Sequence, residues 1–327
     1  MSEQGRVVLV TGGTGFVGSH VVDALLRAGF RARCSVRPTS NQRWLAGKPI
    51  DLVQADLRLP DQLEPAIAGV DAIIHCAGLT RGSRDALMSA NRDGTRALVQ
   101  ACQTTGRRIR FVFCSSQAAA GPGWLDRPRQ ASDRPAPATD YGESKLAAEA
   151  VVAKAEDLDA VVLRPVAVYG PRDEDTLTFF KLATRGIIVT PGLRRRVVQL
   201  VHVRDLASAL IKAVDRPQRS GDVFCIAHPE VVDWDQLAVA MREATGRNAI
   251  TLRVPSFALR MIGAAAELVG GAGLPGRIDR RKAADMSERA WTCDAERAIE
   301  ELDWSPTYNT RDGFRDSVNW YRQEGWL

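Results

Sequence analysis

The feature that most constrains the fold of this chain is a glycine-rich turn near its start. The segment TGGTGFVG at 11–18 ends an aliphatic run and leads into an apolar, helix-compatible run from Phe16 to Ala28. A strand, a tight turn and a helix N-terminus together bind a pyrophosphate, because free N–H groups and the helix dipole face the anion. Gly12 predicts a turn with positive φ, Gly15 a close approach to phosphate, and Gly18 tight helix packing. We expect dinucleotide binding; the alternative is an ordinary strand-to-helix loop.

Strand-like and helix-like runs alternate through the first half of the chain. Further strands are expected at 31–37, 50–57, 70–78, 109–116 and 160–165, and helices at 84–104 and from Tyr141 onward. This alternation predicts an α/β fold of the Rossmann type, a doubly wound parallel sheet with a smaller C-terminal lobe. We place the dinucleotide-binding domain at 1–171 and the substrate lobe at 172–327. Strands near 197–203 and 222–227 are expected to return to the main sheet.

The lobe is expected to contain several helices. They are predicted at 175–185, 205–214, 234–245, 257–268, 294–302 and 310–323. The apolar stretch 256–274 is interrupted by Arg260 and Glu267 and is too polar for a transmembrane segment. It fits a core helix, the wall of an apolar ligand pocket, or a peripheral contact with a membrane surface.

Composition narrows the class of protein further. With 45% hydrophobic and 25% charged residues, the 327-residue chain has the balance of a globular enzyme. The net charge of +5 is spread over many arginines, which suits an anionic ligand but predicts no nucleic-acid-binding stripe. The six cysteines form no CxxC pair, so we expect buried free thiols, no metal site and a cytoplasmic location. The short polar N-terminus does not read as a signal peptide.

Two strand ends are candidates for contact with the adenosine half of a dinucleotide. The second strand ends at Arg37 with no acid nearby, which favours NADP because a guanidinium can bind a 2′-phosphate. A solvated surface arginine is the alternative, and NAD stays open as the cofactor. The third strand ends at Asp56 and Leu57, where the carboxylate either meets the adenine amino group or caps the following helix.

The fourth strand ends in small residues. Cys76, Ala77 and Gly78 follow its apolar run, and small side chains there let a cofactor pass over the sheet edge. His75 is one of only four histidines in the chain. Because it follows an apolar run, we interpret it as a packed strand histidine rather than a catalytic one.

Three residues are candidates for proton chemistry. Tyr141 and Lys145 are four apart at a helix start, so their side chains share one face. A free tyrosine has a pKa near ~10, and a neighbouring ammonium lowers it toward the working range. Ser116, at the end of the fifth strand, is placed to hold a substrate oxygen. A proton donor, a charge that tunes it and an orienting hydroxyl then surround one carbonyl.

These motifs together resemble an extended short-chain dehydrogenase/reductase, in the dihydroflavonol-reductase and hydroxysteroid-dehydrogenase branch of the epimerase/dehydratase superfamily. The matching segments are TGGTGFVG at 11–18, DL at 56–57, NRDGT at 91–95, SS at 115–116, YGESK at 141–145, LRPVAVYGP at 163–171, HVRDLA at 202–207, WSP at 304–306 and WY at 320–321. The resemblance covers nearly the whole chain, and the first 171 residues carry its more specific part.

The resemblance implies a catalytic Ser/Thr-Tyr-Lys set at Ser116, Tyr141 and Lys145. Ser116 is preferred over Ser115 because family members place this hydroxyl five residues before the glycine that is Gly121 here. The residues assigned to the cofactor are Gly12, Thr14, Gly15, Phe16, Val17, Arg37, Asp56, Leu57, Cys76, Ala77, Gly78, Pro165 and Val168, the last two beside the nicotinamide. Asn91 is expected to support the site from behind, and His202 and Asp205 to be structural.

The resemblance also leaves several functions to compare. Sugar-nucleotide epimerases and dehydratases usually carry Asn at the position of Ala167 and Arg near Val198, and both are absent here. We therefore expect reversible ketone/alcohol chemistry on an apolar small molecule, cyclic substrates included. The alternatives are an NAD-retaining sugar-nucleotide epimerase or dehydratase and a non-catalytic NADP-binding regulator. In the first, Arg194–Arg196 would take the place of the missing arginine, although a solvated basic turn is the commoner meaning of such a run. Relatives commonly form homodimers through helices flanking the sheet, and we expect the same here.

Overall fold

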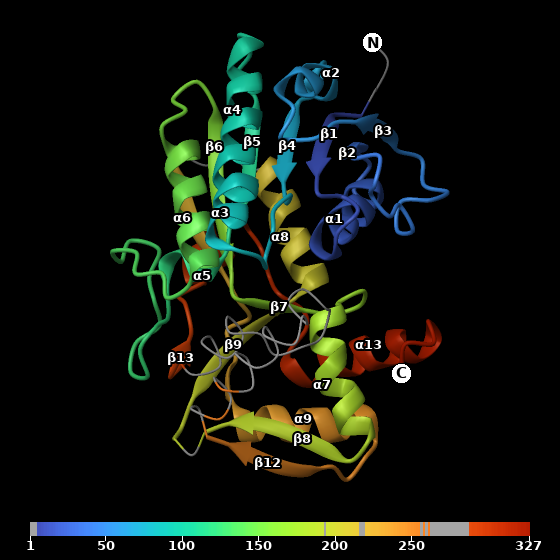
Figure 1. Cartoon of the computed structure of the whole chain (residues 1–327), viewed down its shortest axis with the longest axis vertical. Helices are drawn as coiled ribbons and strands as arrows, with labels where there is room; N and C mark the ends of the chain where they lie inside the picture. The colour runs from blue at the N-terminus through green and yellow to red at the C-terminus, as the bar shows by residue number, and fades with distance from the viewer. Residues whose placement is uncertain (1–4, 193, 216–219, 256–257, 259–260, 262–287) are drawn as a thin grey trace.

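A computed structural model describes residues 5–192, 194–215, 220–255, 258, 261 and 288–327 (Figure 1). Its centre is a seven-stranded sheet in the order β10-β6-β5-β4-β1-β2-β3, in which every neighbouring pair is parallel. The strands are β1 (Val7–Thr11), β2 (Arg31–Val36), β3 (Asp51–Gln54), β4 (Ala72–His75), β5 (Arg110–Cys114), β6 (Asp159–Pro165) and β10 (Asp222–Ile226). The predicted Rossmann-type parallel sheet is confirmed.

Helices cover both faces of this sheet, as its sequence requires. Successive side chains of a strand point to opposite faces, so Val8 and Val10 join one core while Leu9 joins the other. The first core packs under α1 (Phe16–Arg27) and α8 (Val203–Asp215), and the second under helices of the opposite face. Those helices are α2 (Leu63–Ile67), α4 (Gly94–Thr104) and α6 (Asp140–Ala153). Burial on both faces explains why the central strands are nearly continuous apolar runs.

The long helix expected at 84–104 is interrupted. It consists of α3 (Arg84–Leu87), a π-helical segment η2 (Met88–Asp93) and α4. A 3₁₀ turn η1 (Pro60–Gln62) and a short helix α5 (Gln117–Ala120) complete this half. The proline-rich stretch after α5, residues 121–139, contains no helix or strand.

The C-terminal lobe has its own core. Its strands are β7 (Ala167–Tyr169), β8 (Ile187–Pro191), β9 (Val197–His202), β11 (Val231–Asp233), β12 (Ile250–Val254) and β13 (Ala290–Trp291). Its helices are α7 (Glu174–Thr184), α9 (Trp234–Thr245), α12 (Glu296–Glu301) and α13 (Thr310–Gln323). Buried aromatic residues such as Tyr169, Phe180 and Phe314 hold α7 and α13 against the β7–β9 pair. The helix expected at 257–268 lies outside the described residues.

One strand does not lie where the sequence predicted. The strand near 222–227 pairs with β6 in the main sheet as expected, but the strand near 197–203 does not join that sheet. It is β9, which pairs with β7, β11 and β13 in a separate sheet. The physical reason is that β7 continues β6 past the carboxyl edge of the main sheet, and β9 pairs with that continuation. The place beside β6 itself is taken by β10.

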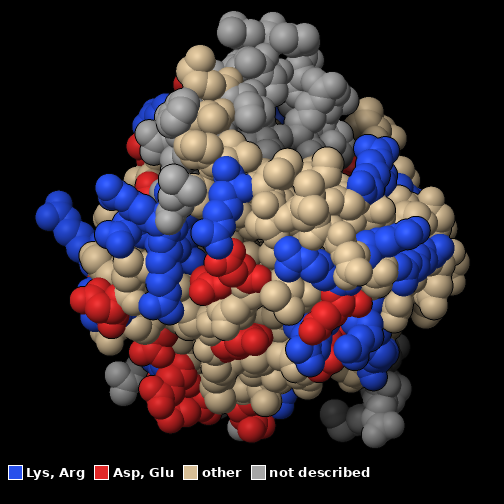
Figure 2. All heavy atoms as spheres, turned by 90° about the horizontal axis from the view of Figure 1, so that it is seen from below, with Lys and Arg blue, Asp and Glu red and all other residues tan. Residues whose placement is uncertain are grey.

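The described residues also bear on the compositional predictions. All six cysteines are free; five are buried and Cys76 is partly exposed. Within the described ranges, no group of side chains is suited to hold a metal ion, and no helix is long and apolar enough to cross a bilayer. Figure 2 views the end of the molecule that carries β8, β12 and α9, where Lys and Arg side chains gather on both the left and the right.

Candidate active site

The glycine turn between β1 and α1 has the geometry that a pyrophosphate needs. Gly12 has φ of 73°, and a Cβ there would lie 2.7 Å from the Ala77 nitrogen. A Cβ on Gly18 would overlap the Gly12 carbonyl oxygen, so Gly18 packs the helix onto the turn itself. Gly15 is the exposed N-cap of α1, and no described side chain caps the helix there. The first N–H groups of α1 therefore face outward for an anion, and these residues fit a dinucleotide.

The small residues after β4 have a second structural reason besides the cofactor. A Cβ on Gly78 would lie 2.7 Å from Oδ1 of Asn91. The same oxygen accepts a hydrogen bond from the Leu79 nitrogen at 2.8 Å, while Nδ2 donates to the Leu79 carbonyl at 2.9 Å and to Ser144 Oγ at 2.8 Å. Asn91, in the π-helical segment η2, therefore ties the loop after β4 to α6. A π-helical insertion of this kind often marks a functional site.

His75 is a packed strand histidine, as interpreted from the sequence. It is fully buried, and its ring nitrogens lie 2.6 Å from Thr11 Oγ1 and 2.9 Å from Thr95 Oγ1. Burial lowers the pKa of His75 to about 3, with the Lys145 charge adding to the effect. The ring is therefore neutral and joins β1, β4 and α4.

Arg37 and Asp56 lie close together at the carboxyl edge of β2 and β3. Asp56 does not cap the next helix, because Leu59 precedes η1 without a side-chain cap. Its carboxylate instead accepts hydrogen bonds from Arg58 Nε at 3.0 and 3.1 Å. These bonds lower the pKa of Asp56 to about 2 against the effect of burial, and the Arg37 charge acts in the same direction. Arg58 is a second guanidinium at this edge that the sequence analysis did not single out.

Ser115 and Ser116 end β5 with different partners. Ser115 is buried, and its hydroxyl donates to the Glu149 carboxylate, which also accepts hydrogen bonds from Arg164 at 2.6 and 2.9 Å. Ser116 is the N-cap of α5, and its Oγ accepts from the Ala118 nitrogen at 3.1 Å. An oxygen that accepts this bond keeps its own proton for another acceptor. This difference supports the choice of Ser116 over Ser115.

Tyr141 and Lys145 lie one turn apart near the start of α6. The helix is capped by Thr139, whose hydroxyl accepts from the Gly142 nitrogen at 3.2 Å. Lys145 is 5% exposed; its ammonium donates to the Cys114 carbonyl at 2.8 Å and lies 4.3 Å from the centre of the Phe113 ring. Burial lowers the pKa of Lys145, while the nearby Cys114, Cys76 and Glu149 act in the opposite direction.

A cavity of about 470 Å³ brings these side chains together. Ser116, Tyr141 and Lys145 line it together with Phe16 and Val17 at the start of α1. Cys76, Gly78, Pro165 and Val168 line the same space. The other assigned positions, which are Gly12, Thr14, Gly15, Arg37, Asp56, Leu57 and Ala77, are not among its lining residues. Of these, Leu57 packs into the core beside Gly94 of α4.

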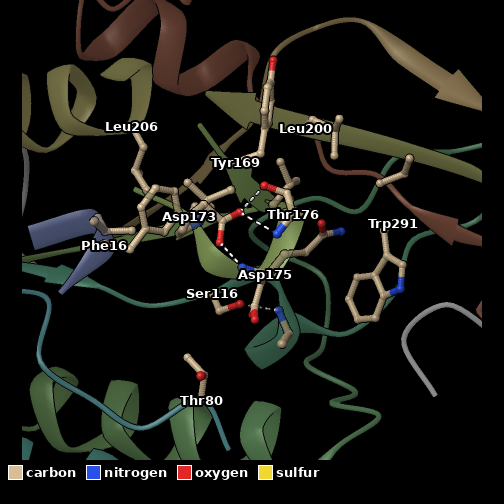
Figure 3. Close-up of a pocket in the computed structure, with 18 of the residues that line it drawn as sticks. Phe16, Thr80, Ser116, Tyr169, Asp173, Asp175, Thr176, Leu200, Leu206 and Trp291 are labelled. Atoms are coloured by element: carbon tan, nitrogen blue, oxygen red, sulfur yellow. Dashed lines mark hydrogen bonds between the residues drawn. The ribbon is translucent and has the colours of Figure 1, made fainter. Parts of the chain in front are cut away.

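The far wall of the cavity is apolar and belongs to the C-terminal lobe. Its side chains include Phe179, Leu200, Trp234, Met241 and Trp291, which come from α7, β9, α9 and β13. Figure 3 shows Leu200 and Trp291 on the same side of the space as Thr176. Sequence analysis did not assign these residues, because an isolated apolar side chain in a helix or strand looks the same whether it faces a core or a ligand.

Two aspartates at the start of α7 also face this cavity (Figure 3). Asp173 caps the helix: its carboxylate accepts from the Asp175 nitrogen at 2.9 Å, the Thr176 nitrogen at 3.2 Å and Thr176 Oγ1 at 2.6 Å. Burial raises the pKa of Asp173 to about 6. Asp175 pairs with Arg81 from the loop after β4. The Arg81–Asp175 pair therefore joins the dinucleotide half to the lobe beside the cavity.

His202 and Asp205 lie outside the lining of the cavity and have structural partners. The Asp205 carboxylate accepts hydrogen bonds from Thr307 and from the Tyr308 nitrogen at 2.9 to 3.0 Å. His202 is fully buried, and its ring stacks on Tyr308 with centroids 4.0 Å apart. Both side chains hold the C-terminal segment against β9 and α8, as the sequence analysis expected.

A parallel sheet with a glycine turn at its centre, and a cavity that runs from the start of α1 into a second lobe, define a dinucleotide-binding protein of the Rossmann type. Comparison with known sequences specifies the class. The chain belongs to the NAD dependent epimerase/dehydratase family, whose profile matches residues 8–227. Its relatives include extended short-chain reductases. The protein is therefore an enzyme of the NAD(P)-dependent oxidoreductase or epimerase kind, with a nicotinamide cofactor.

Three known proteins illustrate the similarity. The chain is 29% identical over 323 residues to a ceramide reductase of Caulobacter vibrioides, covering 98% of this chain and 96% of the relative. It is 30% identical over 341 residues to a putative dihydroflavonol 4-reductase of Synechocystis, covering 97% and 95%. The crystal structure of gox2253 superposes with a TM-score of 0.81 at 27% identity, covering 98% of this chain and 99% of that one.

Proposed function

We propose that this enzyme transfers a hydride between NADP and the ketone or alcohol carbon of an apolar small molecule, open-chain or cyclic. The observation that carries the proposal is one cavity lined by Ser116, Tyr141 and Lys145 at one end and by apolar lobe side chains at the other. The similarity to a ceramide reductase and to a putative dihydroflavonol 4-reductase supports ketone/alcohol chemistry.

The preference for NADP rests on the edge of β2. Arg37 is exposed there, and Arg58 lies beside it through their shared neighbour Asp56. A guanidinium can donate two parallel hydrogen bonds to a 2′-phosphate, whereas an NAD site usually presents a carboxylate to the ribose. Asp56 is held by Arg58, so the edge keeps a positive balance. NAD is the alternative cofactor.

In the proposed mechanism, the residues of this chain orient the substrate and move one proton. Pro165 and Val168 would border a bound nicotinamide, which in its reduced form would supply the hydride. Ser116 donates a hydrogen bond to the carbonyl oxygen, and Tyr141 passes its phenolic proton to that oxygen as the hydride reaches carbon. The products are the alcohol and the oxidised nucleotide. Lys145 supplies a fixed positive charge one turn away that stabilises the resulting phenolate.

The apolar wall of the lobe lowers the polarity around this step. A mostly apolar space strengthens the attraction between the Lys145 ammonium and the phenolate, since fewer water dipoles screen it. Lys145 is held by the Cys114 carbonyl and the Phe113 ring, so its charge is already in place before substrate binds. In the reverse direction the phenolate accepts the proton from the alcohol.

The proposal is tested by following loss of NADPH absorbance with a panel of apolar acyclic ketones, cyclic ketones and quinones. We expect turnover with at least one class, and a fall of roughly 10²- to 10⁴-fold in kcat for Tyr141→Phe. The Tyr308→Phe variant is the control, because Tyr308 is placed on His202 away from the cavity. Unchanged turnover in Tyr141→Phe on the same ketone would show that the proton donor is another group.

The second candidate function is an NAD-retaining sugar-nucleotide epimerase or dehydratase, which the family name includes. Ala167 and Val198 both line the cavity, so the two positions that usually carry Asn and Arg in such enzymes present apolar groups to the ligand. This favours the apolar substrate. An epimerase would release bound NAD when denatured, whereas we expect the purified protein to need added NADPH. A non-catalytic regulator has no need for all three of Ser116, Tyr141 and Lys145.

The remaining expectations concern the state of the protein in the cell. We expect a homodimer, formed through helices that flank the main sheet, and a cytoplasmic location. Mass measurement of the purified protein in solution and cell fractionation test these two expectations directly.

A further inference from the structure

A second, smaller cavity of about 180 Å³ opens beside the first one and has a different character. Four arginines line it: Arg194, Arg195 and Arg196 from the turn before β9, and Arg253 from the end of β12. Its two acidic residues, Asp233 and Asp235, already have partners. Figure 2 shows Lys and Arg side chains gathered on both sides of this end of the molecule, and β8 and β12 end on the left in Figure 1.

The two aspartates offset only part of the positive charge of this cavity, because four arginines line it against two carboxylates. Asp233 is the N-cap of α9, and its carboxylate accepts from the Asp235 and Gln236 nitrogens at 3.0 and 2.9 Å. Asp235 pairs with Arg253 at 2.8 Å. The three consecutive arginines therefore dominate the charge of this cavity.

Arg196 shows that this turn is more than a solvated basic loop. Its side chain is 8% exposed, and its Nη1 donates to the carbonyl oxygens of Pro191 at 3.2 Å and Arg194 at 3.3 Å. Burial lowers the pKa of Arg196, and the positive charges of Arg194 and Arg289 lower it further. The Glu288 carboxylate acts in the opposite direction, but two guanidiniums stand against it, so a bound anion would further stabilise the charge of Arg196.

The two cavities adjoin each other. Trp234, the first residue of α9, lines both of them. Arg196 directly precedes Val197 on β9, and Val197 and Val198 line the first cavity. Trp234 is therefore a wall that the two cavities share, and a charged group attached to a ligand in the first cavity would reach the arginines by passing it.

We propose that the arginine-lined cavity is a subsite for a phosphate monoester group carried by the substrate, whose apolar part occupies the first cavity. The substrate class is then an amphiphile whose apolar part carries the reacting ketone or alcohol and whose other end carries the phosphate. That it is the substrate rests on the proposed function; that an amphiphilic anion binds here does not. Arginine forks match the oxygens of a phosphate, and several of them compete with water for a doubly charged group.

Binding of decyl phosphate tests the proposal in the full chain without any turnover. Isothermal titration at low salt compares decyl phosphate with 1-decanol, inorganic phosphate and UDP-glucose. We expect decyl phosphate to bind at least about tenfold more tightly than 1-decanol or inorganic phosphate alone, since the two parts of one molecule occupy adjoining sites. The Arg194→Gln/Arg195→Gln double variant is expected to weaken decyl phosphate about tenfold and to leave 1-decanol unchanged.

Both exchanged arginines are exposed, so the double variant is expected to fold normally. The matched control is Arg108→Gln, an exposed arginine before β5, which should bind both probes as the parent does. Equal affinities for decyl phosphate and 1-decanol would overturn the proposal, as would a double variant that binds decyl phosphate normally. If inorganic phosphate binds as tightly as decyl phosphate, the cavity is a site for a free anion. If UDP-glucose binds more tightly than decyl phosphate, the cavity is a site for a nucleotide diphosphate. Either result overturns the proposal.

The outcome is separable from that of the proposed function. Tyr141→Phe should keep the affinity for decyl phosphate while losing ketone turnover. If reductase activity is found and the anion preference is absent, only the subsite is wrong. If the anion preference is found and no ketone is reduced, the subsite stands and the proposed reaction fails.

Discussion

The two halves of the site are built in different ways. On the cofactor side, short contiguous segments carry the geometry: the turn at 11–18 and the small residues at 76–78 act mainly through their backbone. On the substrate side, the wall is assembled from single side chains of α7, β9, α9 and β13. Backbone recognition tolerates few residue types, because only glycine permits the required φ and close approach. Side-chain recognition tolerates many, so the same fold accepts different substrates.

The largest effect is expected from a methyl group placed on the cofactor side. In Gly18→Ala the new Cβ overlaps the Gly12 carbonyl oxygen, so either the turn or α1 must move. The N–H groups that face the pyrophosphate move with it, and a displacement of about 1 Å can weaken the function of such a site by roughly 100-fold. We expect NADPH affinity to fall by about that factor in a fluorescence titration.

Gly246→Ala is the matched control on the lobe side. Gly246 has φ of 68° at the end of α9, with nothing within 4 Å of an added Cβ. The variant should lose about 1 kcal/mol of unfolding free energy from backbone strain and keep its NADPH affinity. A similar loss of NADPH affinity in both variants would remove the distinction between the two halves.

The next effect tests the lobe side alone. Trp291→Ala removes a large apolar surface from the far wall of the cavity, opposite the cofactor side. We expect KM for an apolar ketone to rise about tenfold, because the substrate loses contact area, while the Kd for NADPH stays the same. Trp124→Ala, which changes an indole that is 44% exposed in the loop after α5, is the control. A raised Kd for NADPH in Trp291→Ala would mean that the two halves are not independent.

The same contrast explains how much the sequence predicted. The seven strands of the main sheet were expected from the alternation of strands and helices, whereas their order was not predicted. Ser116, Tyr141 and Lys145 were singled out from contiguous motifs. The pairing of β9 with β7 did not, because an apolar strand does not reveal which sheet it joins. The π-helical turn at 88–93 was also missed, since its residues have ordinary helix propensity and the Asn91 contacts with Leu79 and Ser144 are tertiary.

A smaller effect is expected at the edge of the cofactor side. Arg37→Ala removes an exposed guanidinium that belongs to no structural pair among the described hydrogen bonds and salt bridges. One charged hydrogen bond at such a surface contributes about 1 kcal/mol, so NADPH should bind roughly fivefold more weakly and NADH should be unaffected. The ratio of the two Kd values measures this directly. An equal change for both nucleotides would argue for NAD as the cofactor.

The smallest effect on ligand binding is expected for Asp173→Asn, which changes the pH dependence of folding stability instead. Burial raises the pKa of Asp173 from 3.8 to about 6, so between these values the folded protein holds a proton that the unfolded chain has released. Folding stability therefore falls as pH rises through this window, by at most about 3 kcal/mol. Asp173→Asn keeps a cap for α7 and has no carboxyl to titrate. The unfolding free energy of Asp173→Asn in urea, minus that of the parent, should increase from pH 4 to pH 7.

Asp233→Asn separates this charge effect from the exchange of a cap. Asp233 caps α9 in the same way as Asp173 caps α7, by accepting hydrogen bonds from the backbone nitrogens two and three residues later. It is less buried than Asp173. The Asp233→Asn variant therefore measures how exchanging a carboxylate for an amide at a helix N-cap changes the unfolding free energy. This change is subtracted from the one measured for Asp173→Asn. Parallel pH curves for the parent and Asp173→Asn would mean that water reaches the carboxylate at the start of α7. The lobe side of the cavity would then be wetter than its apolar wall implies, and the case for an apolar substrate would weaken with it.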